Sequence, residues 1–354
     1  MDFIDKSRKE IDTIDGEIAA LLQKRWLLAS DIAAYKEQNH LPIVDKQREE
    51  EILTRLKKHF ASPFLQECAE RCFSSIIEQS KLVEQFSQKR QNPFAKVGII
   101  GIGLIGGSIA KAIKSKDPSV QISSLRREDQ DIDRAMQSHM VDTCFSSLQE
   151  LIDHVDVLIL SPPLSFIETY AKEISSLSQG RKEKLLVLDV GSIKERICSS
   201  FAKLSHEGVE FVATHPMAGR EKGSFPHSLA SLFTGRCWAL CPHPHTTEEA
   251  LNTVRDFLCF LGAHPLIVTG EEHDRHAACI SHLPYILSHA FLQFTQRTCP
   301  EALQMSGPGF ASFIRLGQDS PELHEDIYSM NGNNIRPLLQ SFLTYLQQQE
   351  HDAK

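Results

Sequence analysis

A glycine-rich turn after a short apolar run constrains the fold of this chain more than any other feature. The segment KVGIIGIGLIGGSIAKAI carries G-x-G-x-x-G at Gly101, Gly103 and Gly106, between a β-type run and a helical one. There the first glycine allows a tight turn, the second lets the backbone approach a pyrophosphate, and the third lets helix and strand pack closely. Amides at the helix start, at Leu104 and Ile105, would meet the negative charge. The pattern predicts a Rossmann-type domain that binds a nicotinamide dinucleotide.

The end of the second predicted strand bears on the form of this cofactor. The strand VQISSL is followed by RRED. An acidic residue at this place binds the ribose 2′-hydroxyl of NAD, whereas an arginine accommodates the 2′-phosphate of NADP. Arg126 stands at about that place with Arg127 beside it, which favours NADP over NAD. Glu128 and Asp129 would serve the ribose if the strand ended later.

The chain changes character near Gln91. Upstream, Gly16 is the only glycine and apolar residues recur at helical spacing, which predicts helices at about 5–38, 45–59 and 63–87. Downstream, short apolar runs alternate with helical segments, which is typical of a parallel sheet with helices on both faces. The runs expected as strands are KVGIIGI, VQISSL, DVLILS, KLLVLDV and VEFVAT. After about Glu271 the pattern is helical again.

The expected fold class is therefore an all-α helical bundle fused to an α/β Rossmann domain, which is followed by a helical C-terminal domain. We place these domains at residues 1–90, 96–270 and 271–354, with a linker at 91–95. A length of 354 residues suits two or three domains.

Bulk composition excludes several functional classes. The formal net charge of −8 argues against a nucleic-acid partner or an anionic membrane surface. No apolar stretch approaches the roughly 20 residues of a membrane span, and the charged start MDFIDKSRKEID lacks the apolar core of a secretory signal. Nine scattered cysteines, an odd number, favour free thiols. We therefore expect a cytoplasmic protein.

One cluster of metal-ligand residues stands out, at Cys237, Cys241, His243 and His245. Prolines interrupt the cluster and no second half follows at zinc-site spacing. We expect no metal.

The first predicted helix carries an apolar seam at heptad spacing. It is also long: at roughly 1.5 Å per residue it would extend about 50 Å. That is too long for a compact monomeric domain of about 90 residues, so we expect a partner chain to cover part of it and the protein to be a homodimer. The seam consists of Ile4, Ile11, Ile14, Ile18, Leu21, Leu28, Ile32 and Tyr35.

Arg25 falls on this seam, where an apolar residue is expected. A buried arginine is costly unless an anion meets it. Lys36 follows about three turns later and shares the face. Arg8 is turned about 100° away, so it could more easily reach a partner's pocket than this one.

Polar residues on the other two predicted helices complete the set. Asp45, Arg48 and Glu49 share one helix face, and Ser80 and Glu84 share another. A bundle interior with several cations and a few acceptors suits a small dicarboxylate. The alternative is that these residues only set the helix register or lie on solvated faces.

Residues 1–88 resemble the AroQ-type chorismate mutases. The resemblance lies in R-x-x-I-x-x-I-D at Arg8, K-R-x-x-L-A at Arg25, Lys36, and D-x-x-R-E at Asp45. It implies that Arg25, Arg48 and Arg8 of the other subunit bind the two carboxylates of chorismate. Lys36 and Glu84 would hydrogen-bond the ether oxygen, Glu49 with Asp45 would hold the ring hydroxyl, and Ser80 completes the pattern. The reaction is a Claisen rearrangement, driven by positioning and electrostatic stabilisation.

Glu84 stands where some members of that family have glutamine. A glutamate can donate to the ether oxygen only when it is protonated. Mutase activity is therefore expected to fall as the pH rises, and a rate independent of pH in both the parent chain and Glu84→Gln would contradict this.

Further motifs follow in the second part of the chain. They are DVGSIKERI, THPMAGREKGSF, EEHDRHAACISHLP and GPGFASFIRLGQDSPELHEDI. His215 follows a strand and precedes Pro216, so we expect it in a loop at the carboxyl edge of the sheet, where α/β proteins bind ligands. Ser192, after the preceding strand, should lie on the same edge. A purely structural histidine is the alternative.

These motifs resemble the TyrA family of prephenate and arogenate dehydrogenases, over about residues 96–340. The resemblance implies that His215 accepts the proton of the substrate's ring hydroxyl, and that Ser192 supports His215 or the same hydroxyl. Glu221 would lie in a gating loop and Arg315 would bind a substrate carboxylate. Hydride passes to the nicotinamide and carbon dioxide is lost. The helical C-terminal domain would bind substrate and form the dimer.

Three positions depart from that family's pattern. Tyr285 replaces a common histidine, Ser312 a common aspartate, and His324 an aromatic residue. They leave the substrate preference open, with Tyr285 expected in the substrate pocket.

Taken together, the two resemblances imply a bifunctional enzyme of tyrosine biosynthesis that converts chorismate to prephenate and prephenate to 4-hydroxyphenylpyruvate. One alternative is an arogenate or dual-specificity (cyclohexadienyl) dehydrogenase whose helical segment is only a dimerisation or regulatory module. Another is a 2-hydroxy-acid dehydrogenase. We see no room for a regulatory domain after about residue 350, so L-tyrosine is expected to inhibit at the dehydrogenase site.

Overall fold

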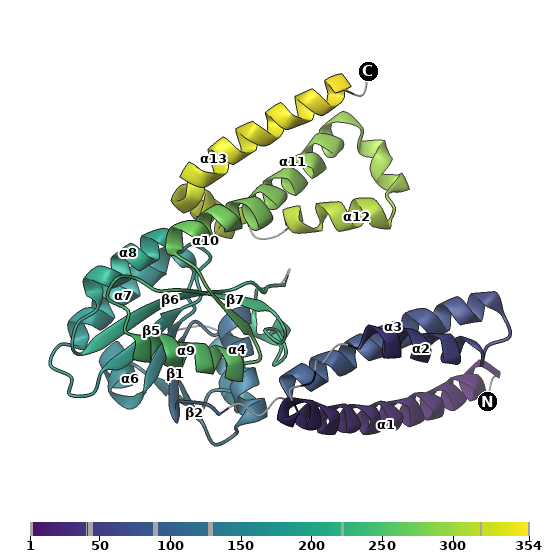
Figure 1. Cartoon of the computed structure of the whole chain (residues 1–354), viewed down its shortest axis with the longest axis horizontal. Coiled ribbons are helices and arrows are strands. Elements are labelled where there is room, and N and C mark those ends of the chain that lie inside the picture. The colour runs from purple at the N-terminus through teal and green to yellow at the C-terminus, as the bar shows by residue number, and fades with distance from the viewer. Residues whose placement is uncertain are drawn as a thin grey trace. The chain divides into compact units, whose positions relative to one another are not determined.

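The computed structural model describes residues 3–39, 41, 45–87, 91–126, 130–220, 223–318 and 321–352. The chain divides into two compact units, Met1–Gln91 and Asn92–Lys354. Each unit is described by itself (Figure 1).

The first unit is a three-helix bundle. Its helices are α1 (Phe3–Gln38), α2 (Lys46–Lys57) and α3 (Pro63–Phe86), which confirms the three predicted helices. The carboxylate of Asp45 accepts the backbone N–H of Arg48 at 3.0 Å and so caps α2. Ala29 and Ala33 of α1 are buried, and α1 lies along α3 (Figure 1).

The apolar seam of α1 remains exposed within this chain. Its eight members are between 47% and 66% exposed. Arg25, which shares the heptad spacing of the seam, turns its side chain to α3, as does Lys36, and Ala29 and Ala33 of α1 are buried. Keeping this much apolar surface in water costs roughly 25 cal/mol per Å². That cost favours a second chain over this face, and the homodimer stays a prediction.

The second unit is built on one twisted sheet of eight strands in the order β3-β2-β1-β4-β5-β6-β7-β8. The strands are β1 (Lys96–Ile100), β2 (Gln121–Leu125), β3 (Thr143–Phe145), β4 (Val157–Leu160), β5 (Leu185–Asp189), β6 (Val209–Pro216), β7 (Cys237–Cys241) and β8 (His264–Ile267). The five predicted strands are confirmed. β3, β7 and β8 were not predicted.

One strand pair corrects the expected parallel sheet. β7 runs antiparallel to β6, with His215 opposite Ala239 and Pro216 opposite Trp238. The other pairs of the sheet are parallel. Pairing with β7 extends β6 through His215, so the expectation that this histidine lies in a loop is wrong.

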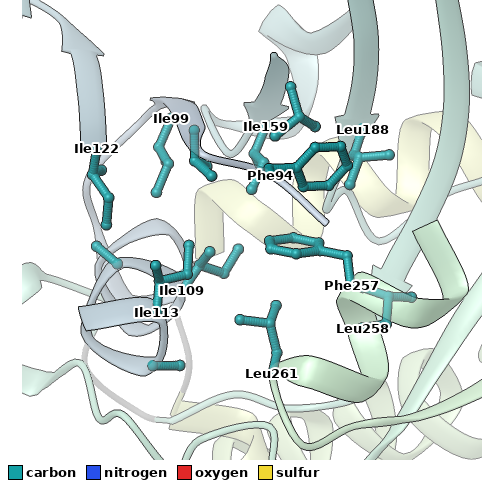
Figure 2. Packing of buried hydrophobic residues seen from close by; sticks show 14 of the residues in the cluster. Phe94, Ile99, Ile109, Ile113, Ile122, Ile159, Leu188, Phe257, Leu258 and Leu261 are labelled. Atoms are coloured by element: carbon teal, nitrogen blue, oxygen red, sulfur yellow. The ribbon is translucent and has the colours of Figure 1, made fainter. Parts of the chain in front are cut away.

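Helices cover both faces of the sheet, because successive strand residues point to opposite sides. Val157 and Ile159 of β4 enter one apolar cluster, whereas Leu158 and Leu160 enter another. The first cluster includes α4 (Leu104–Lys116), α5 (Gln130–Gln137) and α9 (Glu248–Phe260), and the second includes α6 (Leu148–His154), α7 (Ile167–Leu177) and α8 (Glu195–Leu204). Figure 2 shows the first cluster, where Phe94 meets Phe257 of α9 edge to face at 5.3 Å.

The end of the chain is helical, as predicted. It comprises α10 (Gly270–Ala277), α11 (Leu283–Thr298), α12 (Pro308–Ile314) and α13 (Pro321–Asp352), with a π-helical turn at Ala278–His282 between the first two. A domain boundary near residue 270 stays a prediction. No helix in the described ranges is long and apolar enough to cross a membrane.

A buried ion pair fixes the carboxyl ends of β5 and β6. The ammonium of Lys194, whose side chain is wholly buried, contacts the Asp189 carboxylate and donates to Thr214 O at 2.8 Å. Asp189 also accepts the N–H groups of Thr214 at 3.0 Å and Gly191 at 2.8 Å. These bonds join the two strands next to His215.

Lys194→Met should destabilise the second unit by roughly 3–5 kcal/mol, because it leaves the Asp189 carboxylate buried without its cation. Guanidinium unfolding followed by Trp238 fluorescence, in a Trp26→Phe background, measures this unit. Arg255→Met is the control: it breaks a pair with Asp256 in which the two side chains are 49% and 67% exposed, and it should cost at most about 1 kcal/mol. Equal losses would contradict the special role of the buried pair.

Candidate active sites

The glycine turn has the geometry of an anion cradle. Gly101 has φ +95°, and a Cβ there would collide with Ser161 O. A Cβ at Gly106 would collide with Gly101 O, so helix α4 could not pack against the end of β1. α4 begins at Leu104, which directs its first amides to the turn. These residues fit the pyrophosphate of a dinucleotide.

The residue after β2 is an arginine, as predicted. β2 ends at Leu125, and the guanidinium of Arg126 lies 3.0 Å from the Asp133 carboxylate, with both side chains about half exposed. Arg127, Glu128 and Asp129 lie outside the described residues.

The loop after His215 docks on the cofactor helix. The Leu104 N–H donates to Gly223 O at 2.9 Å, and the Leu229 N–H donates to the hydroxyl of Ser108 at 3.0 Å. A Cβ at Gly107 would lie 2.6 Å from the ring of Phe225. Gly107 and Ser108, the last two residues of GLIGGS, therefore allow this loop to pack on α4, a role that was not predicted from the sequence. Glu221, also of this loop, lies outside the described residues.

His215 lies at the end of β6, half-buried, and bonds a second histidine. Its Nδ1 is 2.9 Å from His273 Nε2, and His273 Nδ1 is 2.8 Å from the Asp274 carboxylate. The His-Asp pair of α10 has no role among the predicted site residues. The signal for it was an ionisable pair that begins four residues after the capping residue Thr269.

The surroundings of His215 keep its imidazole neutral. Burial lowers its pKa well below 6.5, and the nearby His273, Lys194 and His282 add to the effect. Burial also lowers the pKa of His282, to about 4. A neutral His215 can accept a proton.

Ser192 does not bond His215 in this structure. Its hydroxyl is buried and has no hydrogen-bond partner among the described residues. It is therefore available to a ligand at the carboxyl edge of the sheet.

The C-terminal helices position Arg315. The Ser288 hydroxyl donates to Phe313 O and accepts the Gly317 N–H, both at 2.8 Å, so it ties the turn at Arg315 to α11. Arg315 is exposed, and no hydrogen bond or ion pair in the described part of the chain engages it or joins it to His215. Tyr285 is buried and stacks on His289 at 5.7 Å. Ser312 is exposed, and the side chain of His324 lies outside the described set.

In the helical unit, predicted residues of α1 and α3 meet. Arg25 donates to the hydroxyl of Ser80 and, at 3.4 Å, to Ile76 O. Lys36 pairs with Glu84 at 2.8 Å, and both side chains are at most 20% exposed. The predicted cluster of cations and acceptors therefore forms between these helices.

The residues of α2 divide. Glu49 faces α3 and pairs with Lys81 at 3.1 Å, a cation that sequence reasoning missed. The side chain of Arg48 instead lies 3.5 Å from Glu51 and is 56% exposed. Arg8 is exposed, with no hydrogen bond or ion pair to any described residue.

Comparison with protein families matches three segments. The family model for chorismate mutase type II matches residues 7–85. The model for the prephenate dehydrogenase nucleotide-binding domain matches residues 109–267, and that for the prephenate dehydrogenase dimerization domain matches residues 269–351.

Several known proteins are similar over much of the chain. The T-protein of Haemophilus influenzae is 26% identical over 95% of this chain and 83% of its own. The cyclohexadienyl dehydrogenase of Zymomonas mobilis is 25% identical over 72% of this chain and 86% of its own. The prephenate dehydrogenase of Bacillus subtilis is 28% identical over 67% of this chain, which spans 64% of that relative.

Solved structures resemble the second unit. A prephenate dehydrogenase from A. aeolicus in complex with hydroxyphenyl propionate and NAD+ superposes with a TM-score of 0.66 at 26% identity, covering 72% of this chain and 89% of that one. The Synechocystis arogenate dehydrogenase gives a TM-score of 0.59 at 25% identity, covering 72% and 90%.

The stability of the second unit should fall as the pH drops from 6.5 toward 4. The folded pKa of His282, about 4, lies below the unfolded value near 6.5, so the unfolded chain takes up the proton first and gains population. The contribution of neutral His282 to the unfolding free energy is fully present above pH 6.5 and is lost as the pH falls through about 4. It amounts to on the order of 3 kcal/mol.

His282→Gln should therefore flatten the slope of unfolding free energy against pH, as measured by urea titration at several pH values. His276→Gln, at an exposed position of α10, is the control and should leave the slope unchanged. An unaltered slope in His282→Gln would contradict the buried neutral state.

Proposed function

Because this chain belongs to the prephenate dehydrogenase family and carries a chorismate mutase type II domain ahead of the dehydrogenase, we propose that it catalyses two consecutive steps of tyrosine biosynthesis. The helical unit rearranges chorismate to prephenate. The second unit oxidatively decarboxylates prephenate to 4-hydroxyphenylpyruvate. The observation that carries the proposal is that one chain holds both matched domains, so the product of the first reaction is the substrate of the second.

The mutase step needs only placement and charge. Arg25, fixed by Ser80, and Arg8 of a second copy would bind the carboxylates of chorismate, and Arg48 would turn from Glu51 to join them. Lys36 would stabilise the charge that develops on the ether oxygen, and Glu84 would donate to it when protonated. Glu49, with Asp45, would hold the ring hydroxyl. The fall of mutase activity with rising pH stays a prediction.

In the dehydrogenase step, His215 acts as the general base. Its Nε2 would accept the proton of the ring hydroxyl while Ser192 bonds the same oxygen, and Arg315 would hold a carboxylate. When bound, the nicotinamide supplies the hydride acceptor. Loss of carbon dioxide makes the ring aromatic, which makes the step effectively irreversible. The loop of Glu221 would close over the substrate.

Prephenate is favoured over arogenate because the fused mutase produces it. The departures at Tyr285, Ser312 and His324 leave the substrate preference open. A dehydrogenase for arogenate, or for both substrates, is the competing function. L-tyrosine would compete at the same site, and inhibition non-competitive with prephenate would count against that.

The exposed seam of α1 and the dimerization-domain match support a homodimer. All nine cysteines are free, which supports a cytoplasmic location.

A separation-of-function experiment tests the proposal. Arg25→Ala should lower chorismate turnover by about 100-fold or more while prephenate oxidation is unchanged, because it removes a donor to a substrate anion. His215→Asn should lower prephenate oxidation by about 10²–10⁴-fold and spare the mutase. The assay reads prephenate formation, reduced cofactor and carbon dioxide, with prephenate and arogenate each tested.

Lys57→Ala, which breaks an ion pair between α2 and α3 away from these residues, is the matched control for Arg25→Ala. A parent chain that does not turn over chorismate would reduce the helical unit to a dimerisation or regulatory module. A preference for arogenate, or oxidation without carbon dioxide release, would favour the competing dehydrogenases.

NADP is proposed as the preferred cofactor because Arg126 follows β2 directly. Arg126→Ala should lower kcat/KM for NADP by about tenfold or more and leave NAD unaffected, since a charged hydrogen bond to the 2′-phosphate is lost. Arg134→Ala removes an arginine of α5 that pairs with Asp131 and should change neither. Equal losses with both cofactors, or a parent chain that prefers NAD, would contradict this assignment.

A further inference from the structure

Two buried residues of α10 hold the ring of His215 from one side. The rings of His215 and His273 meet edge to face at 71°, with centroids 5.1 Å apart and Nδ1 of the first 2.9 Å from Nε2 of the second. His273 and Asp274 are 5% and 1% exposed. Nε2 of His215 has no hydrogen-bond partner among the described residues. The three groups form a chain from a carboxylate to the free nitrogen of His215.

The carboxylate at the start of this chain is itself fixed. Asp274 accepts the N–H of Lys194 at 2.7 Å and of Glu195 at 2.9 Å, at the start of α8. A helix N-terminus favours a negative charge. The carbonyl of Asp274 accepts from the Asn331 amide of α13 at 2.8 Å. Helices at both ends therefore hold Asp274 in place.

The direction of these hydrogen bonds follows from the groups involved. An ionised carboxylate can only accept, so the proton between Asp274 and His273 sits on His273 Nδ1. In a neutral imidazole the other nitrogen is then an acceptor, and His273 Nε2 receives the N–H of His215 Nδ1. Nε2 of His215 is left without a proton and can accept one.

We propose that His273 is a positioning residue that holds His215 in the tautomer whose Nε2 accepts the proton of the substrate hydroxyl. The proposal rests on the proposed dehydrogenase function of His215 and extends it to the His-Asp pair of α10. A carboxylate that orients a histidine base is a known way to fix a tautomer. Here a second imidazole stands between the carboxylate and the base.

The charged groups around His215 agree with this arrangement. Lys194 lies before α8 and His282 lies in the π-helical turn, and both disfavour a protonated His215. The charge of Lys194 is balanced by Asp189 of β5. The amide of Asn331 lies 3.2 Å from His282 Nδ1. His215 is thus held neutral, which the tautomer requires.

Two substitutions of His273 separate positioning from structure. His273→Asn retains an amide near Asp274 but is too short to reach His215. His273→Gln places a carbonyl oxygen where it can accept from His215 Nδ1. We expect His273→Asn to lower kcat for prephenate oxidation by about 100-fold or more, with KM for the dinucleotide unchanged, and His273→Gln to regain at least about tenfold.

Two internal controls accompany these variants. The mutase activity of the same chain should be unchanged in both. His276→Asn, at an exposed position of the same helix, should leave both activities unchanged. Full kcat in His273→Asn, or equal losses in His273→Asn and His273→Gln, would overturn the proposal.

The tautomer can also be read without turnover. In ¹⁵N NMR of histidine-labelled chain, the signals lost in His215→Asn identify His215. Nε2 of His215 should then have the shift of a bare nitrogen and Nδ1 that of a protonated one, whereas His273→Asn should show a mixture of tautomers. A parent His215 protonated at Nε2 would overturn the proposal. If the parent chain oxidised neither prephenate nor arogenate, the proposed function would fail, and the NMR result would still decide the role of His273.

Discussion

The second unit depends on one buried lysine that is used twice. The ammonium of Lys194 neutralises Asp189 and donates to the carbonyl of Thr214. It therefore joins the ends of β5 and β6 directly before His215. Its backbone N–H bonds Asp274, which holds His273 and through it His215. A buried ion pair contributes little net stability compared with an apolar packing of the same volume. Its use here is geometric, since a single residue sets both the strand that carries the base and the carboxylate behind it.

The sequence predicted the parts of this unit that local pattern determines. Gly101 and Gly106 were identified because no other residue fits those backbone positions, and the apolar strands β1, β2, β4, β5 and β6 were identified by their length and composition. The antiparallel direction of β7 could not be predicted, because it depends on which neighbour the strand meets. The hydrogen bond between His215 and His273 could not be predicted for a similar reason. The two residues are far apart in sequence, and only the packing of α10 against the sheet brings them together.

The helical unit shows the same division. Helical spacing placed Ser80 and Glu84 on one face of α3 and Arg25 and Lys36 on one face of α1, and the structure pairs Arg25 with Ser80 and Lys36 with Glu84. It did not foresee Lys81, since a lysine beside a polar face is ordinarily a solvated one. Arg48 turns to Glu51, a neighbour one helical turn away on α2.

The docking of the loop after β6 on helix α4 has a consequence for anion binding at the glycine turn. The amide of Leu104 donates to Gly223 O, yet it is also among the first amides of α4, which an anion at the glycine turn would approach. An anion bound there would compete with the loop for one donor, so part of its binding energy would be spent on releasing Gly223. By linkage the effect would be reciprocal. An interaction that stabilises the loop on Leu104 would weaken anion binding, and one that draws the loop toward the substrate would strengthen it. The loop after β6 and the glycine turn would then be coupled through the N–H group of Leu104.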